Sequence, residues 1–301
     1  MTIDNPQPGA PIEAPFTLDG LQVVPGEIGL QVIASNGEVS TTRETSLRVE
    51  CAGCPVIFLE EPEPSAVFEE PVLPRVRGRI VPAGASSLRY RVVDRLGQAF
   101  DGPLRVRAED GFAVFAADQV PLFGGLNRVE ITAPGGTGDT ARCATSVAAP
   151  DEDPSSVRAV LRWDTMGSDL DLILVGPGAS LFDIEGVLAP GREGGLEGQV
   201  LDDVDGLGPE HLWTNVLPEG TYGLAVAAMF SEGSAVVTPI AGGRLGSERP
   251  LGPVFLSAGR GDLWLVGTVR VAAGVATFEP VDRIFSGFEV PMEPPERWSE
   301  L

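Results

Sequence analysis

The chain has 301 residues and a formal net charge of −22, with 43 acidic side chains, 21 basic side chains that are all Arg, and a single His. This charge argues against nucleic-acid binding, which needs cationic side chains against the phosphates, and anionic membranes would also repel the chain. The absence of Lys excludes Schiff-base lysines and the phosphate-binding lysine of Walker motifs.

The composition favours an all-β protein. Gly and Pro contribute 38 and 27 residues, and no long stretch has helical periodicity, as expected for many short strands joined by turns. The length suits two or three domains. No run of about 18 apolar residues occurs, so we predict no membrane span. The first residues have neither a basic segment nor an apolar segment of a signal peptide. We therefore expect export by another route, or an internal start within a longer protein.

Residues 1–52 look like the second half of an immunoglobulin-like module. Pro25-Gly26 precedes an apolar run, Asn36-Gly37 marks a turn, and a second strand-like run follows. A whole sandwich of this class needs about 100 residues. Two interpretations stay open: a partial immunoglobulin-like unit, or a small β extension that packs on its neighbour.

Residues 53–149 are predicted to form a complete immunoglobulin-like β-sandwich, because short strand-like runs recur at the spacing of that class. The segment 123–147 resembles the closing strands of bacterial immunoglobulin-like repeats and echoes 25–49, which favours a tandem array over generic β patterning. The segments 60–64 and 69–74 are rich in Glu and Pro and suit an edge strand or surface loop. The strand-like runs are 56–61, 75–82, 88–94, 102–109, 111–120, 125–134 and 141–149.

The three cysteines are Cys51, Cys54 and Cys143. First and last strands of such sandwiches often run side by side, so we favour a Cys54–Cys143 disulfide, with a local Cys51–Cys54 bridge as the alternative. A zinc site with His211 is not expected, because the spacing is irregular and the residues fall in different predicted domains.

The acidic, Pro-containing segment 149–155 is predicted to be a linker to a last domain at 156–279. In Ser156–Gly176 the apolar residues alternate, which predicts two strands joined by a turn near Asp164–Gly167. We expect a hairpin with Arg162 opposite Asp169 and Leu161 opposite Leu170, because this register puts every large apolar residue on one face. The residues of that face are Val157, Ala159, Leu161, Trp163, Leu170, Leu172 and Leu174.

Several short motifs of this domain occur in an order that resembles the DUF2135 (YfaP-like) family of bacterial β domains. They are Trp163-Asp164, Asp169-Leu170-Asp171-Leu172, Pro177-Gly178, the segment 202–210 and Gly220-Thr221-Tyr222. The match covers roughly 120 residues, a typical domain size. The Asp-Leu-Asp-Leu and Gly-Thr-Tyr pieces are also similar to bacterial pre-peptidase C-terminal domains. The resemblance implies a β-sandwich and an extracytoplasmic setting, and it implies no known reaction.

Further strands are predicted in the rest of this domain, with Gly-rich loops at 176–200 and 241–252 that we expect to be mobile. The segment 280–301 is expected to be an irregular, acidic, Pro-rich tail that docks on the sandwich through Phe285, Phe288 and Trp298. The predicted strands are 213–217, 221–230, 235–241, 253–258, 262–271 and 274–280.

Five aspartates form the candidate metal site: Asp169, Asp171, Asp202, Asp203 and Asp205. Residues two apart on one strand face are only about 6.5 Å apart, so their like charges need a cation between them. Hard oxygen ligands from strand and loop positions are those that calcium prefers. In the alternative interpretation, Arg158 and Arg162 neutralise Asp169 and Asp171 across the hairpin, and the Asp-rich segment 202–206 is an ordinary turn. The EF-hand spacing is absent.

The sequence predicts no enzyme. Any Ser-His-Asp arrangement would have to use His211, which we interpret as a turn residue, and neither a Gly-x-Ser-x-Gly nor a His-Glu-x-x-His motif occurs. We expect a non-enzymatic extracytoplasmic or cell-surface spacer and interaction protein, stabilised by calcium, with a protein or glycan partner. The alternative is an accessory carbohydrate- or substrate-binding module of a larger secreted enzyme. Exposure of Trp163, Trp213, Tyr222 and Trp264 as a sugar-stacking platform would favour that alternative, whereas their burial would favour the spacer.

Overall fold

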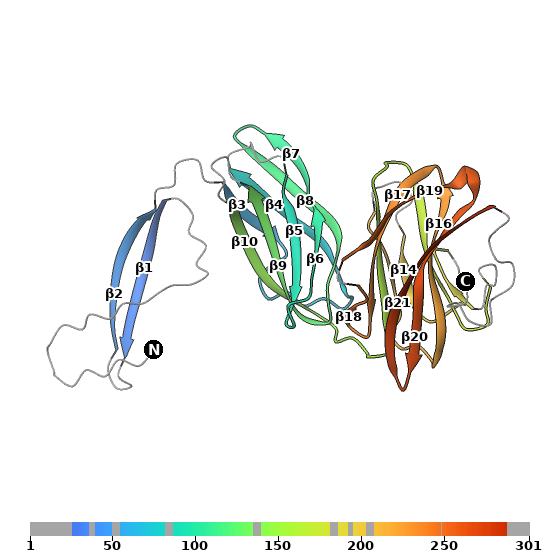
Figure 1. Cartoon of the computed structure of the whole chain (residues 1–301). Helices are drawn as coiled ribbons and strands as arrows, with labels where there is room; N and C mark the ends of the chain where they lie inside the picture. The colour runs from blue at the N-terminus through green and yellow to red at the C-terminus, as the bar shows by residue number, and fades with distance from the viewer. Residues whose placement is uncertain are drawn as a thin grey trace.

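The computed structural model describes residues 26–35, 40–49, 55–81, 87–134, 140–180, 186–191, 195–202, 208–247 and 249–287. These residues form strands β1 to β21 and one short 3-10 helix, Ala258–Arg260, which confirms the all-β prediction (Figure 1). Among them, no helix has the length and apolar character needed to cross a bilayer.

The first two strands form a separate antiparallel hairpin. β1 (Gly26–Ser35) pairs with β2 (Ser40–Val49) along its whole length, from Gly26 opposite Val49 to Ser35 opposite Ser40. The turn predicted at Asn36-Gly37 lies outside the described residues. Whether 1–52 is a partial immunoglobulin-like unit stays a prediction.

The middle part is a β-sandwich of two four-stranded antiparallel sheets, with sheet orders β3-β4-β8-β7 and β10-β9-β5-β6. Alternation drives the packing: in β8, for example, Ala113, Phe115 and Ala117 are buried while their neighbours are less so. The chain passes from one sheet to the other at Leu104, which divides one predicted strand into two. The strands are β3 (Val56–Glu61), β4 (Val72–Val81), β5 (Arg89–Asp94), β6 (Ala99–Pro103), β7 (Arg105–Glu109), β8 (Phe112–Pro121), β9 (Gly125–Pro134) and β10 (Thr140–Ala149).

β10 and β3 lie next to each other, as the disulfide prediction assumed. Cys143 is buried in β10. Cys51 and Cys54 lie outside the described residues, so the pairing stays a prediction.

The C-terminal part is a second sandwich. One sheet, here called the inner sheet, has the order β14-β15-β11-β17-β18, and β19 also pairs with β17; the other, the outer sheet, has the order β13-β12-β16-β20-β21. Tyr222, near the start of β16, donates a hydrogen bond from its hydroxyl to the Pro218 carbonyl (2.8 Å), the arrangement of a tyrosine corner. The strands are β11 (Val157–Trp163), β12 (Asp169–Val175), β13 (Val187–Leu188), β14 (Gln199–Leu201), β15 (Glu210–Trp213), β16 (Gly220–Phe230), β17 (Glu232–Ala241), β18 (Arg244–Leu245), β19 (Leu251–Ser257), β20 (Asp262–Ala272) and β21 (Val275–Ser286).

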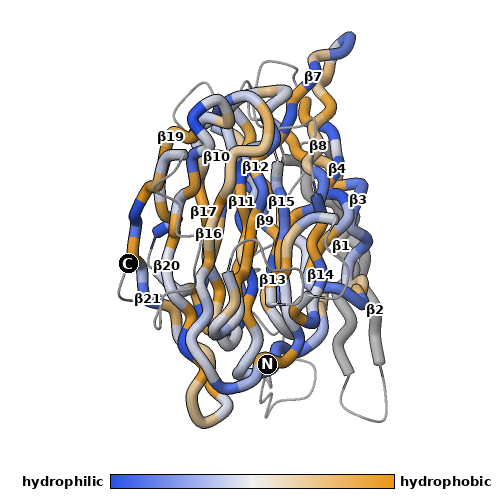
Figure 2. Tube along the Cα trace, turned by 90° about the vertical axis from the view of Figure 1, so that its right-hand side faces the viewer, coloured by the Kyte–Doolittle hydropathy of each residue, from blue (hydrophilic) through white to orange (hydrophobic). Residues whose placement is uncertain are grey.

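The predicted hairpin between β11 and β12 is wrong in its pairing. β11 pairs with β15 and β17 in the inner sheet, whereas β12 pairs with β13 and β16 in the outer sheet. The connection 164–168 therefore crosses between the sheets. The predicted faces are correct, because Leu161, Trp163 and Leu170 all lie in the same buried core. Figure 2 shows the hydrophobic stretches of β11 and β17 side by side.

Three further expectations are corrected. The Gly-rich segments 176–200 and 241–252 contain the short strands β13, β14 and β18, and β19 begins at Leu251. The C-terminal domain extends past residue 279, because β21 continues to Ser286 opposite β20. Phe285 is part of this strand and is buried in a small core that also contains Val175 and Leu265. Phe288 and Trp298 lie outside the described residues.

The two sandwiches share an interface along the inner sheet. β11 is buried on both faces: Val157, Ala159 and Leu161 face their own core, and Val160 is also buried on the opposite face. Ile240 of β17 belongs to the core of the middle sandwich. The Gln98 amide donates to the Gly243 carbonyl (3.1 Å) and accepts from the Leu245 amide (2.9 Å).

The predicted linker is part of this interface. The Glu152 carboxylate forms an ion pair with the Arg158 guanidinium and accepts a hydrogen bond from the Gly124 amide (2.9 Å). Both side chains are more than nine-tenths buried. The segment is therefore held in place at its centre.

Candidate metal centre

Three of the five predicted aspartates come together at one edge of the C-terminal sandwich. One carboxylate oxygen from each of Asp169, Asp171 and Asp202 lies within 4.8 Å of the others. Asp169 and Asp171 are half-buried on β12, and Asp202 is exposed directly after β14. Because β12 and β14 belong to opposite sheets, the cluster bridges the gap between them. Asp203 and Asp205 lie outside the described residues, so their roles stay predictions.

A fourth carboxyl group, which sequence reasoning missed, lies beside this cluster. Glu210 begins β15, opposite Leu161 of β11, and its side chain is fully buried. Its Oε1 accepts a hydrogen bond from the Leu172 amide of β12 (2.7 Å), so this side chain also connects the two sheets. Its Oε2 is buried and accepts no hydrogen bond from any residue that the structure describes.

The position of Glu210 follows from strand register. β14 and β15 pair with Leu201 opposite His211, so the next position in this register brings Asp202 opposite Glu210. Leu172, whose amide holds Glu210, directly follows Asp171. Burial, together with the negative charges of Asp171, Asp202 and Asp169, raises the pKa of Glu210 to about 10. The carboxyl group thus faces the three aspartates from the interior of the sandwich.

The alternative interpretation of the aspartates, pairing with arginines across a hairpin, is wrong. Arg158 and Arg162 lie on the inner sheet and point toward the middle sandwich. Arg158 binds Glu152 and the carbonyls of Pro71 and Leu122. Arg162 donates to the Tyr90 hydroxyl, and its guanidinium lies 5.6 Å from the centre of that ring.

His211 lies in strand β15 rather than in a turn, and its side chain points to the opposite face from Glu210. It is buried at the interface, where its Nε2 makes a 2.6 Å hydrogen bond with the Gln119 carbonyl. Burial lowers the pKa of His211 to about 3, so the ring is neutral at pH 7. The described partner of this nitrogen is thus a backbone carbonyl in the interface.

The aromatic residues proposed for sugar stacking are buried. Trp163 and Trp213 are 5% exposed, Tyr222 is 1% exposed and Trp264 is 0% exposed. Trp264 donates from its indole nitrogen to Asp282 (2.9 Å). These four side chains therefore do not form a platform on the surface.

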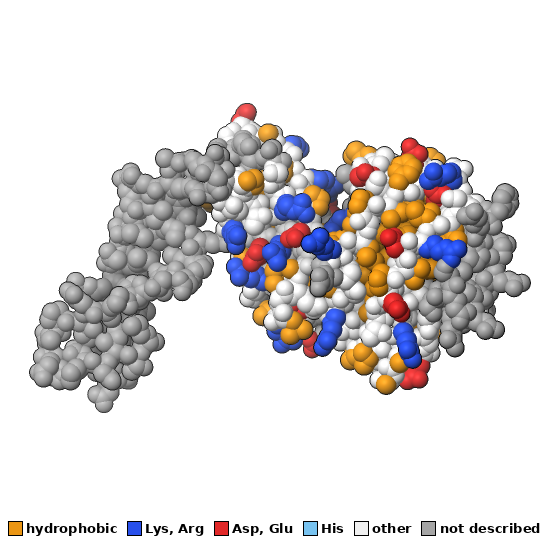
Figure 3. Space-filling view, viewed as in Figure 1, with side chains coloured by type: hydrophobic (Ala, Val, Ile, Leu, Met, Phe, Trp, Pro, Cys, Tyr) orange, Lys and Arg blue, Asp and Glu red, His pale blue; other side chains and the backbone are white. Residues whose placement is uncertain are grey.

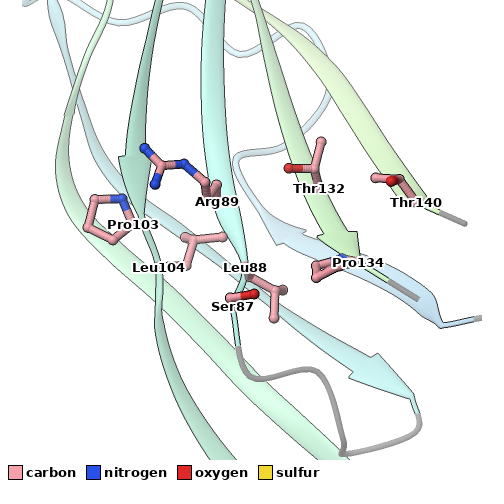
Figure 4. A pocket seen from close by; sticks show the side chains of 8 residues that line it. All are labelled: Ser87, Leu88, Arg89, Pro103, Leu104, Thr132, Pro134 and Thr140. Carbon is pink, nitrogen blue, oxygen red and sulfur yellow. The ribbon is translucent and has the colours of Figure 1, made fainter. Parts of the chain in front are cut away.

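A pocket at one end of the middle sandwich is lined by few charged or reactive side chains (Figure 4). Among its described lining residues, Arg89 carries the one charge, and no carboxylate or thiol faces it. Apolar and hydroxyl side chains make up the rest, namely Ser87, Leu88, Pro103, Leu104, Thr132, Pro134 and Thr140.

No family model and no curated protein matches the sequence. Among solved structures, the chain is similar to CopC from Methylosinus trichosporium OB3b (14% identity, TM-score 0.25), over 32% of this chain and 95% of that chain. It is also similar to the fibronectin(III)-like modules of Clostridium thermocellum CbhA (10% identity, TM-score 0.21), over 67% of this chain and 92% of that chain. A tetra-tandem repeat from the extending region of a large adhesion protein is similar over 90% of this chain and 74% of that chain (13% identity, TM-score 0.26). At these identities and scores the likenesses say nothing of function.

Proposed function

We propose that this chain is a non-enzymatic extracytoplasmic or cell-surface protein that acts as a spacer and presents one end of its C-terminal sandwich to a protein partner. The observation that carries this proposal is a group of exposed apolar side chains at that end. Met166, Met229, Phe230 and Phe255 are between 49% and 79% exposed, and together they are here called the apolar end. Exposed apolar groups that gather in this way mark interaction sites on soluble proteins.

Hydrogen bonds hold the segments of the apolar end together. Asp164, in the connection that carries Met166, accepts from the Ser234 amide (2.8 Å), and Ser234 pairs with Phe255. The Ala258 amide donates to the Ser231 carbonyl (2.8 Å), which joins the turn after Phe230 to the end of β19. The apolar end therefore consists of one connection, which carries Met166, held against the end of β16 and the strand β19.

The distribution of aromatic and charged side chains supports a protein partner over a glycan. Sugar-binding platforms need exposed Trp or Tyr rings, and the four candidate rings are buried. The visible face of the middle sandwich mixes acidic and basic side chains, whereas apolar surface gathers on the C-terminal sandwich (Figure 3). Met and Phe side chains suit an apolar protein surface.

A position-specific crosslinking experiment on intact cells of the source organism tests this proposal. A photo-reactive residue at Met166 should give a discrete adduct that Phe230→Asp abolishes, and the same probe at exposed Val67 of the middle sandwich should not. Digestion of the tagged chain by protease added to intact cells should show that it is outside the cytoplasm. Equal adducts at both positions, or complete protection from protease, would contradict the proposal.

A binding assay with insoluble polysaccharides separates the two candidate functions. The full chain should stay in the supernatant with cellulose, chitin and xylan. Depletion that soluble oligosaccharides reverse would instead favour the accessory carbohydrate-binding module.

A further inference from the structure

Glu210 is an unusual residue for the interior of a sandwich. A buried carboxyl group without a cation or a full set of hydrogen bonds costs stability. Glu210 has one amide donor for two oxygens, and its neighbours are acids rather than bases. Among the described residues, Arg158 and Asp262 are charged groups buried to a similar degree, and each has an ion-pair partner. Leu at this position would pack against Leu161 and Leu172 without that cost.

The surroundings of Glu210 have the chemistry of a cation site. The three aspartates offer oxygens within 4.8 Å of one another. Glu210 lies outside this group of oxygens but beside it: its Oε1 binds the amide of Leu172, which follows Asp171, and its buried Oε2 binds no described residue. These groups come from β12 of the outer sheet, from β15 of the inner sheet and from the residue directly after β14 of the inner sheet.

We propose that Asp169, Asp171, Asp202 and Glu210 bind one calcium ion, which joins the two sheets of the C-terminal sandwich at their edge. This inference goes beyond the proposed function, because it requires no partner. The three aspartates hold the ion toward solvent, and the Oε2 of Glu210 moves toward them as the internal ligand when the ion binds.

The donor set favours calcium among the common divalent metals. All four groups are carboxylates, whereas zinc prefers imidazole and thiolate ligands. The one histidine nearby, His211, points away into the domain interface. Calcium accepts six to eight oxygens in flexible geometry, which suits ligands from separate strands, while magnesium demands a near-octahedral arrangement and keeps several waters.

Calorimetric titration and thermal melting of the full chain test the site. After dialysis against EDTA, the protein should bind calcium at one site, and saturating calcium should raise its melting temperature by several degrees relative to EDTA. Magnesium should bind more weakly. The absence of both saturable binding and a shift at millimolar calcium would overturn the proposal, and magnesium affinity equal to that of calcium would overturn the choice of metal.

The variant Glu210→Gln distinguishes a ligand from a merely structural acid. Gln has the shape of the neutral acid and can accept the same bond from Leu172, so the variant should fold and melt in EDTA at least as high as the wild type. As a ligand substitution it should weaken calcium binding by at least about tenfold, the loss typical even of groups that only orient metal ligands. An unchanged calcium response would overturn the role of Glu210.

Two more variants complete the test. Asp171→Asn should also lose the calcium response, because it removes a charged ligand on the outer side of the site. Asp110→Asn, in an exposed turn of the middle sandwich, changes the net charge equally and should leave the response intact. A similar loss in Asp110→Asn would show that calcium acts through overall charge and would overturn the site.

Discussion

Two acids of the C-terminal sandwich, Glu210 and Asp262, are both buried but are held in opposite ways. Glu210 accepts one backbone hydrogen bond, and its burial raises its pKa to about 10. Burial also acts to raise the pKa of Asp262, but hydrogen bonds from Arg260, Ser286 and the Ser257 amide outweigh it and lower the pKa. At pH 7 Asp262 is therefore a structural anion that fastens the end of β19 to β20 and β21.

The lowered pKa of Asp262 predicts a pH dependence of stability. The folded state holds this proton less tightly than the unfolded state, so the stabilisation is fully present above about pH 4, the ordinary Asp pKa, and is lost as the pH falls toward the lowered value. Asp262→Asn should cost about 1–3 kcal/mol at pH 7, because the charged acceptor is lost, and should show a shallower decline below pH 4. Urea unfolding between pH 3 and 7 measures both. A variant with the same acid slope as the wild type would contradict this role.

The sequence could identify the carboxylate cluster only in part. The spacing of Asp169 and Asp171 on one strand placed them together, and the Asp-rich segment suggested Asp202. Glu210 was missed because it stands between Gly208-Pro209 and the single His, in a segment whose composition resembles a turn. Its alternation with the buried Leu212 was the signal that could have placed it on the interior face. Which acids of different strands meet depends on sheet order, which alternation does not specify.

Glycines covered by an aromatic ring on the neighbouring strand recur among the strands. Tyr90 of β5 pairs with Gly102 of β6, and Phe115 of β8 pairs with Gly78 of β4. A Cβ added to Gly102 would lie 2.2 Å from the Tyr90 ring, and one added to Gly78 would lie 2.4 Å from the Phe115 ring. Each ring occupies the space that a side chain on the glycine would otherwise fill. The position of the ring therefore requires glycine on the neighbouring strand.

Gly102→Ala should therefore destabilise the middle sandwich by about 1–3 kcal/mol, the usual cost of overpacking. Tyr90 would have to move, and its hydroxyl would lose its bond with Arg162. Gly259→Ala, where the nearest atom lies 3.7 Å from the added Cβ, is the matched control and should change stability by less than about 0.5 kcal/mol. Urea denaturation of both variants checks the difference, and equal stabilities would show that the ring adapts freely.

Element by element, most strands could be predicted but not their partners. β9 and β3 have the predicted bounds because apolar alternation and turn residues mark them clearly. β11 and β12 follow each other in the chain, and a hairpin would bury the apolar side of both, so the sequence suggested a hairpin. Alternation shows which side of each strand is buried, but it does not show which strand is its neighbour. A connection at 164–168 can either turn back or cross to the other sheet, and packing around Leu161 and Leu170 selects the crossing. The predicted strand ended at Pro280 because Pro interrupts strand patterns, whereas β21 continues through Asp282, which has a positive φ.

At the scale of the whole molecule, the two sandwiches are joined by buried polar contacts as well as apolar ones. Arg158 reaches from β11 to the carbonyls of Pro71 and Leu122 and to Glu152 in the connecting segment. His211 and Gln98 add hydrogen bonds at other points of the interface. A spacer built in this way keeps a fixed angle between its sandwiches, which a mobile linker would not.

Arg158→Met should destabilise the chain by about 3–5 kcal/mol, because it leaves the Glu152 carboxylate buried without its cation. The double variant Arg158→Met, Glu152→Gln should recover much of this loss. Calorimetry should show one shared transition for the two sandwiches in the wild type and two separate transitions in Arg158→Met. A single variant as stable as the wild type would show that this ion pair contributes nothing to the interface.

The burial of Ile240 in the neighbouring core has a practical consequence for anyone who divides this chain. A cut at the connecting segment would expose Ile240 and Val160 of the C-terminal sandwich to solvent. It would also leave a cavity in the core of the middle sandwich, where Ile240 packs. Such halves would be expected to precipitate when expressed alone and to reassemble when they are mixed. We therefore expect the pair of sandwiches to be the smallest piece that stays soluble.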